Sequence, residues 1–208
     1  EALADHESQR FTGRLGVLYT VNEGVTLFGQ YSQGFKSPEA IDLYYGSHRF
    51  YGPGFNLLTL PNPDLKPERN DAFEIGVRNQ FSIGEFELTL FRNDYQDFID
   101  LQFIGTEYNG QPYDRVSQNV NIDAVTIHGI EMRGGLWLDE WLAPGTSLQY
   151  SAAYAKGRNE TDDLPLDSVA PLKGVIGLHY DAPSETWGAK LVLTAVNGKQ
   201  RHHIATEN

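Results

Sequence analysis

The chain has 208 residues and a formal net charge of -12, with 21 glycines, 11 tyrosines, 11 phenylalanines and no cysteine. The negative charge argues against a nucleic-acid partner, because phosphate binding needs clustered Lys and Arg. The lack of cysteine excludes disulfides and cysteine-based metal sites. Rich Gly and Tyr favour β-structure, and no apolar run approaches the roughly 18 residues of a transmembrane helix.

Strand-like alternation recurs along the whole chain, whereas helical periodicity is weak. The pattern predicts strands, in chain order, at 10–21, 24–35, 70–82, 85–99, 123–138, 146–158, 169–180 and 186–196. Several of these segments exceed the strand length of about 5–6 residues that is usual in globular proteins. They match the roughly 9–11 residues with which a strand crosses a bilayer.

The alternation is clear in segment 85–91, which places Leu88 and Leu90 on one face and Glu87 on the other. A soluble β-sandwich would bury the apolar face. A membrane barrel would turn it outward to lipid and keep the charged face in a wet lumen. The alternation by itself leaves both alternatives open.

The predicted connections alternate between short and long. The short ones fall at 22–23, 82–84, 139–145 and 181–185, and the long ones at 36–69, 100–122 and 159–168. Short turns on one rim and long loops on the other are typical of outer-membrane barrels, whereas the median connection in a compact domain is about 4–6 residues. The sequence therefore predicts an all-β fold: about eight strands of an antiparallel transmembrane β-barrel, with long extracellular loops and short periplasmic turns.

The most specific stretch is NPDLKPER, near the end of the first long connection. Asn62 is suited to initiate a turn, and Pro63 and Pro67 stiffen it. This arrangement places Glu68 at the entry to the next strand.

Three runs, YSQGFKSPEAIDLY, NPDLKPERNDAFEIGVR and LTLFRNDYQDFI, together resemble the TonB-dependent outer-membrane receptors, over most of the chain. The resemblance implies a bacterial outer-membrane transporter, not an enzyme, with a barrel of about 22 strands in the lipid bilayer around a plug. Residues 1–208 are then expected to be part of the C-terminal barrel domain. The plug domain, the segment that contacts the TonB complex and the final barrel strands are expected to lie outside this chain.

Haem-importing members of this family carry a Phe-Arg-Ala-Pro box, then an apical-loop histidine, then an Asn-Pro-Asp-Leu box. Here the first box is similar at Phe35 and Pro38, with Lys36 and Ser37 in place of Arg and Ala. The second box is complete, as Asn62, Pro63, Asp64 and Leu65. The one histidine between the boxes is His48, which the resemblance implies is an axial ligand of haem iron, a role that suits neutral imidazole.

The residues around His48 suit haem, the ligand that the resemblance implies is transported, either free or from a haem-carrying protein. Aromatic side chains there that can pack on a porphyrin are Tyr44, Tyr45, Phe50, Tyr51 and Phe55. Arg49 and Lys36 can pair with a propionate. No nucleophile elbow, phosphate loop or zinc-protease motif occurs in the sequence, so neither a catalytic site nor a catalytic cofactor is expected.

Several alternatives stay open. His48 can be a solvated loop residue, an aromatic loop of this kind also suits a ferric siderophore, and a soluble β-sandwich binding module would share the alternation. His128 and His179 lie within predicted strands and are expected to be structural. Adjacent strand residues point to opposite faces, so His202 and His203 are not expected to chelate one metal.

Overall fold

The computed structural model describes residues 9–166 and 168–198, and His202 and His203 lie outside these ranges. The regular elements are β1 (Arg14–Asn22), β2 (Val25–Lys36), the π-helical turn η1 (Ile41–Tyr45), β3 (Ser47–Phe50), β4 (Asn56–Leu60), β5 (Glu68–Phe81), β6 (Gly84–Tyr108), β7 (Gln111–Trp137), β8 (Thr146–Asn159), β9 (Leu164–Pro165), β10 (Lys173–Asp181) and β11 (Gly188–Val196). No helix in the described part of the chain is long and apolar enough to cross a membrane.

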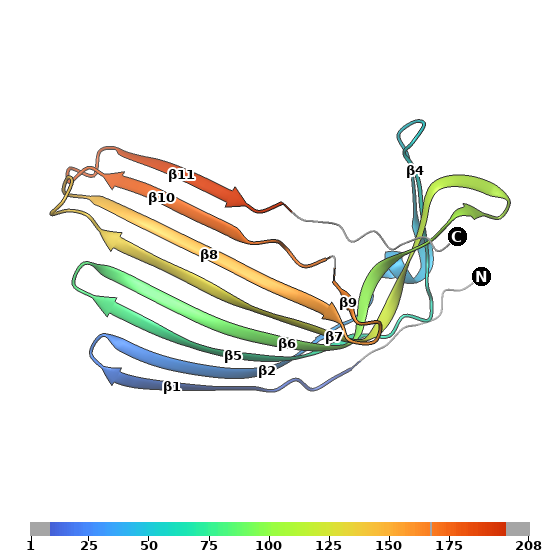
Figure 1. Ribbon diagram of the computed structural model, residues 1–208, viewed down its shortest axis with the longest axis horizontal. Coiled ribbons are helices and arrows are strands. Elements are labelled where there is room, and N and C mark those ends of the chain that lie inside the picture. Colours follow the sequence, from blue (N-terminus) through green and yellow to red (C-terminus); the bar gives the residue numbers. More distant parts are fainter. Residues whose placement is uncertain (1–8, 167, 199–208) are drawn as a thin grey trace.

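Eight long strands form one open sheet in the order β1-β2-β5-β6-β7-β8-β10-β11 (Figure 1). Every neighbouring pair in this order is antiparallel. The two edge strands, β1 and β11, are exposed along their whole length. The predicted all-β architecture with about eight barrel strands is confirmed, and the soluble β-sandwich alternative is wrong, because a sandwich needs two sheets packed face to face.

The strand register separates an apolar face of the sheet from a polar one. Ile75, Leu90, Ile130 and Tyr154 stand directly opposite one another across β5 to β8. These four side chains are 61%, 46%, 40% and 41% exposed. On the other face, a second row pairs Arg78 with Glu87 and Glu87 with Arg133. An apolar outer face and a charged inner face are what a membrane barrel requires.

The connections gather by length at the two ends of the sheet (Figure 1). The two-residue turns 23–24 and 82–83 and the longer turns 138–145 and 182–187 lie at one end. The segment with β3 and β4 lies at the other end, together with the outer parts of β6 and β7. The predicted asymmetry of the two rims is confirmed.

Segment 100–122 is not the predicted loop. It is the outer part of a hairpin in which β6 and β7 stay paired almost continuously to a turn at Asn109 and Gly110. Both turn residues have positive φ, 49° and 73°, as a tight hairpin turn requires. The Asn-Gly pair was the sequence signal for this hairpin.

The hairpin leaves the sheet at Asp97, a non-glycine residue with φ 53° that interrupts the pairing of β6 with β7. The side-chain amide of Asn121 donates a hydrogen bond of 2.7 Å to the Asp97 carbonyl oxygen and so stabilises this bend. Beyond it, β4 adds to β7 as a parallel strand, and β3 pairs with β4. We call residues 47–60 together with 97–122 the outer blade.

Two predicted strand starts shift inward by four residues: β1 begins at Arg14 and β10 at Lys173. For β10 the reason is Pro171, which has no N–H to give to the ladder. The described apolar core lies at the loop end of the sheet, with Leu65, Val116 and Val125 its most buried side chains. The buried cluster of Ile122 and Val125 on β7 with Leu166 therefore lies where the loops meet the sheet.

Candidate functional site

The loop with the predicted site is closed at its base by the pairing of β2 with β5. The register places Phe35 opposite Arg69 and Lys36 opposite Glu68. The Lys36 ammonium lies 3.9 Å from the Glu68 carboxylate, and that carboxylate also accepts a hydrogen bond of 2.9 Å from the Ile99 backbone N–H. Glu68 is only 8% exposed, so its position is set by both neighbouring strands. Lys36 points to Glu68 rather than to the vicinity of His48.

The Asn-Pro-Asp-Leu box is a clamp that attaches the loop to β7. Asn62 accepts a hydrogen bond of 3.1 Å from the Asp64 backbone N–H, which forms the predicted turn. Its side-chain amide donates a hydrogen bond of 2.8 Å to the Asn119 carbonyl oxygen. Leu65 is 2% exposed. The other two box residues, Pro63 and Asp64, are exposed. Asn62 and Leu65 therefore anchor the box.

Amide side chains of β7 bind the rest of this segment, where no strand pairs with it. Gln118 donates to the Pro61 carbonyl oxygen at 2.8 Å. Asn119 donates to the Asp42 carboxylate at 2.8 Å, and the Asn121 carboxamide accepts from the Lys66 N–H at 2.8 Å. Gln118 and Asn121 satisfy backbone groups that a neighbouring strand would otherwise satisfy, whereas Asn119 binds a side chain. These three residues were not predicted from the sequence, although amide side chains at 118, 119 and 121 of one strand were a visible signal.

His48 lies on β3 in the outer blade, and its side chain is exposed. Its Nε2 is 2.8 Å from the Oδ1 atom of Asn56. The ring of Tyr113 meets the imidazole edge-on, with centroids 5.6 Å apart and planes at 82°. Asn56 and Tyr113 are thus the residues that the structure brings to His48, and neither was predicted from the sequence.

The other predicted site residues are spread over the loop. Tyr44 is half-buried and Tyr45 is 67% exposed, both within η1. Arg49 follows His48 on β3 and pairs with Leu57, so its side chain points to the opposite face of the hairpin. Phe50, Tyr51 and Phe55 are exposed at the hairpin tip. The tip turns at Gly52 and Gly54, whose φ values of 116° and 85° favour glycine.

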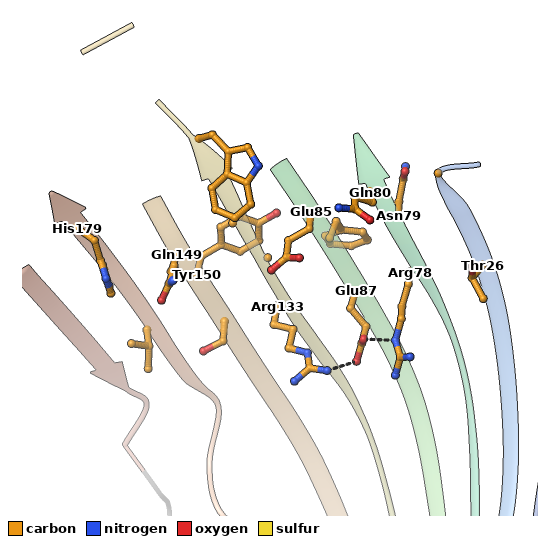
Figure 2. Close-up of a pocket in the computed structure, with 18 of the residues that line it drawn as sticks. Thr26, Arg78, Asn79, Gln80, Glu85, Glu87, Arg133, Gln149, Tyr150 and His179 are labelled. Atoms are coloured by element: carbon orange, nitrogen blue, oxygen red, sulfur yellow. Dashed lines mark hydrogen bonds and ion pairs between the residues drawn. The ribbon is translucent and has the colours of Figure 1, made fainter. Parts of the chain in front are cut away.

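A concave surface, separate from the loop with His48, lies on the polar face of the sheet, toward the end with the short turns, with a volume of about 630 Å³. Figure 2 shows its central feature, in which Glu87 lies between two arginines. The Glu87 carboxylate is 2.5 Å from Arg78 Nε and 2.9 Å from Arg133 Nη2. His179 is part of the wall of this hollow, whereas His128 stands opposite Arg92 and Lys156. In the described residues no group of three or more His, Cys, Asp or Glu is arranged to hold a metal ion.

One sheet with an apolar face, a charged concave face, short turns at one end and structured loops at the other defines an outer-membrane β-barrel protein. The family model "TonB dependent receptor-like, beta-barrel" matches residues 2–206. The chain belongs to this family. It is an outer-membrane receptor protein and not an enzyme, as predicted from the resemblance.

Curated relatives carry names that refer to haemoglobin. A "Probable hemoglobin and hemoglobin-haptoglobin-binding protein 4" of Haemophilus influenzae is 33% identical over 181 residues, 82% of this chain and 18% of that protein. A "Hemoglobin-haptoglobin utilization protein B" of Neisseria meningitidis is 31% identical over 192 residues, 84% of this chain and 23% of that protein. The chain thus spans about a fifth of the length of these relatives.

Solved structures share the fold. The "Copper transporter OprC" superposes with a TM-score of 0.68 at 21% identity, over 89% of this chain and 26% of that one. The siderophore receptor PirA from Acinetobacter baumannii superposes with a TM-score of 0.57 at 22% identity, over 82% of this chain and 26% of that one. Because the names of these two proteins refer to different ligands, copper and a siderophore, the shared fold does not define the ligand.

Proposed function

We propose that this chain is the loop-bearing part of a receptor that takes up haem, with His48 as the extracellular axial ligand of the haem iron. In this proposal, residues 1–208 belong to a larger barrel with a plug domain, and the TonB complex drives uptake through that other part. The haem is taken from a carrier of the haemoglobin type. The receptor changes no covalent bond of its cargo.

One observation carries the proposal: an exposed histidine lies in the outer blade, in the loop that the two boxes close. Ligation to iron needs an imidazole nitrogen that the ligand can reach, and the exposure of His48 provides it. The lack of regular structure in an ordinary long loop would leave such a histidine free to move. Here β3 pairs with β4 and β4 pairs with β7. Strand pairing therefore holds the segment that carries His48 against β7.

The exposed aromatic residues of the blade tip support the same conclusion. Phe50, Tyr51 and Phe55 are 67%, 76% and 60% exposed. Large aromatic side chains left in water are typical of a surface that a ligand or partner covers. The haemoglobin-related names of the relatives agree with a protein carrier as that partner.

The test is a haem titration of the full receptor followed through the Soret band. His48→Ala should weaken binding at least about tenfold, the loss of roughly 1.4 kcal/mol expected for a metal ligand, and should shift the band. His128→Ala, on a barrel strand, is the matched control and should leave both unchanged. An unchanged affinity and an unchanged band in His48→Ala would remove His48 from the site.

A ferric siderophore is the second candidate, and the position of Lys36 favours it. Lys36 is paired with Glu68 at the base of the loop. The first box, in which Lys36 replaces the Arg of the haem-importing members, therefore offers no free cation for a haem propionate. Growth of an iron-starved strain that carries this receptor decides between the ligands. Growth on haem or haemoglobin supports the first proposal, and growth on siderophores alone supports the second.

A further inference from the structure

The side chain of Asn56 joins His48 to the tip of the β6–β7 hairpin. Its Oδ1 lies 2.8 Å from His48 Nε2. Its Nδ2 donates a hydrogen bond of 3.2 Å to the Pro112 carbonyl oxygen. Its backbone N–H donates a hydrogen bond of 2.7 Å to the Asp114 carboxylate. Two contacts thus fix the carboxamide of Asn56, and the third fixes the backbone of the same residue.

This network determines which nitrogen of His48 carries the proton. A carbonyl oxygen only accepts hydrogen bonds, so the group that faces Pro112 must be the NH₂ of Asn56. The atom of Asn56 that faces His48 is therefore the oxygen, which also only accepts. His48 Nε2 must then be the donor, and in the neutral ring the lone pair lies on Nδ1.

Tyr113 restricts the rotation of the same ring. Its ring contacts the imidazole edge-on at 5.6 Å, a favourable geometry for two aromatic rings. Tyr113 lies between the two residues that hold Asn56, and pairing of Leu57 with Arg115 aligns the two segments beside it. The orientation of His48 is thus set by a hairpin more than 50 positions away in the sequence.

We propose that Asn56 is a positioning residue that holds His48 in the Nε2–H tautomer and leaves Nδ1 as the nitrogen offered to iron. Tyr113 fixes the plane of the ring. This inference rests on the proposed function for the identity of the metal, but the tautomer assignment does not. A metal-ligating histidine commonly donates its other N–H to a fixed acceptor, and Asn56 is placed as that acceptor.

The first test needs no haem. Long-range ¹H–¹⁵N NMR of the ¹⁵N-histidine-labelled full receptor, with His48→Ala for assignment, reports which ring nitrogen is protonated. The wild-type should show the Nε2–H pattern at neutral pH, and Asn56→Leu should show a mixture. Asn56→Asp loses the bond to Pro112 but keeps an acceptor for the Nε2–H, so it should show the single pattern. A wild-type Nδ1–H pattern, or an Asn56→Leu spectrum that matches wild-type, would overturn the proposal.

The second test is haem titration of the same variants, with the integrity of the barrel checked by circular dichroism. Asn56→Leu should bind haem about 10–100-fold more weakly, as expected for removal of an outer-shell partner. Asn56→Asp should retain most of the affinity and lower the reduction potential, because a carboxylate makes the ligand more basic. Gln102→Leu, an exposed amide on the same hairpin, is the control and should match wild-type.

The two proposals fail separately. If His48→Ala leaves haem binding unchanged while the Nε2–H pattern stands, the proposed function is wrong and the tautomer assignment is right. If His48→Ala abolishes binding while Asn56→Leu binds like wild-type, haem ligation stands and the positioning role of Asn56 is wrong.

Discussion

The side-chain amide of Asn62 donates a hydrogen bond of 2.8 Å to the backbone carbonyl oxygen of Asn119, 57 positions later in the chain. This contact attaches the second box to the strand that also supports the outer blade. A motif that is a turn in the sequence is thus an anchor in the folded chain. The position of His48 depends on it, because the loop that carries His48 ends at this box.

We expect Asn62→Ala to loosen the loop without unfolding the barrel. The change leaves the Asn119 carbonyl without its donor and removes the acceptor of the Asp64 N–H, a loss of about 1–3 kcal/mol. Hydrogen exchange should accelerate in residues 40–66 and stay unchanged in β10 and β11. Asp64→Ala, at an exposed position of the same turn, should exchange like wild-type. Equal exchange in the two variants would argue against the anchor.

Glu68 should contribute more to the free energy of unfolding than its ion-pair partner Lys36. Glu68→Ala leaves the Ile99 N–H without its acceptor at a buried site and should lower the free energy of unfolding by about 1–3 kcal/mol. Lys36→Ala should cost less than about 1 kcal/mol, because the pair is 3.9 Å long and the Lys36 side chain is 61% exposed. Chemical denaturation of the full receptor measures both. A larger loss for Lys36→Ala than for Glu68→Ala would contradict this assignment.

The arrangement around Glu87 predicts an asymmetry between charge removals on the polar face. Glu87→Ala leaves Arg78 and Arg133, on either side of β6, with no counter-charge between them, and we expect a loss of about 1–3 kcal/mol in unfolding free energy. Arg133→Ala leaves Glu87 paired with Arg78 and should cost less. The double variant Glu87→Ala/Arg133→Ala should recover part of the loss, as unfolding midpoints can show. A strictly additive double variant would mean that Glu87 and Arg133 do not interact.

Two glycines on the sheet give a matched test of strand packing. A Cβ at Gly129 would lie 2.3 Å from the Tyr154 carbonyl oxygen and 2.7 Å from Phe91 Cζ, whereas at Gly174 nothing lies within 4 Å. Gly129→Ala should therefore destabilise the barrel by about 1–3 kcal/mol, and Gly174→Ala should be close to neutral. Thermal unfolding in detergent distinguishes them. Equal midpoints would show that the sheet adjusts at Gly129 without cost.

Much of the barrel was predictable from local sequence because its physical cause is local. Alternation with period two places Leu90 and Glu87 on opposite faces whichever strands lie beside them. Short turns at 23–24 and 82–83 force neighbouring strands to be antiparallel. The hairpin around Asn109 and Gly110 was also encoded locally, but its polar flanks lack clean alternation and were predicted as a loop.

The candidate site divides in the same way. The sequence by itself determined the alternating strands, the Asn62 turn and a single histidine between two boxes, since each depends on neighbours in the chain. Only the tertiary structure decided that Asn56 and Tyr113 meet His48, that Lys36 is paired with Glu68, and that Arg49 points away from His48. The register between strands far apart in sequence sets those contacts, and a shift of one residue would reverse every face.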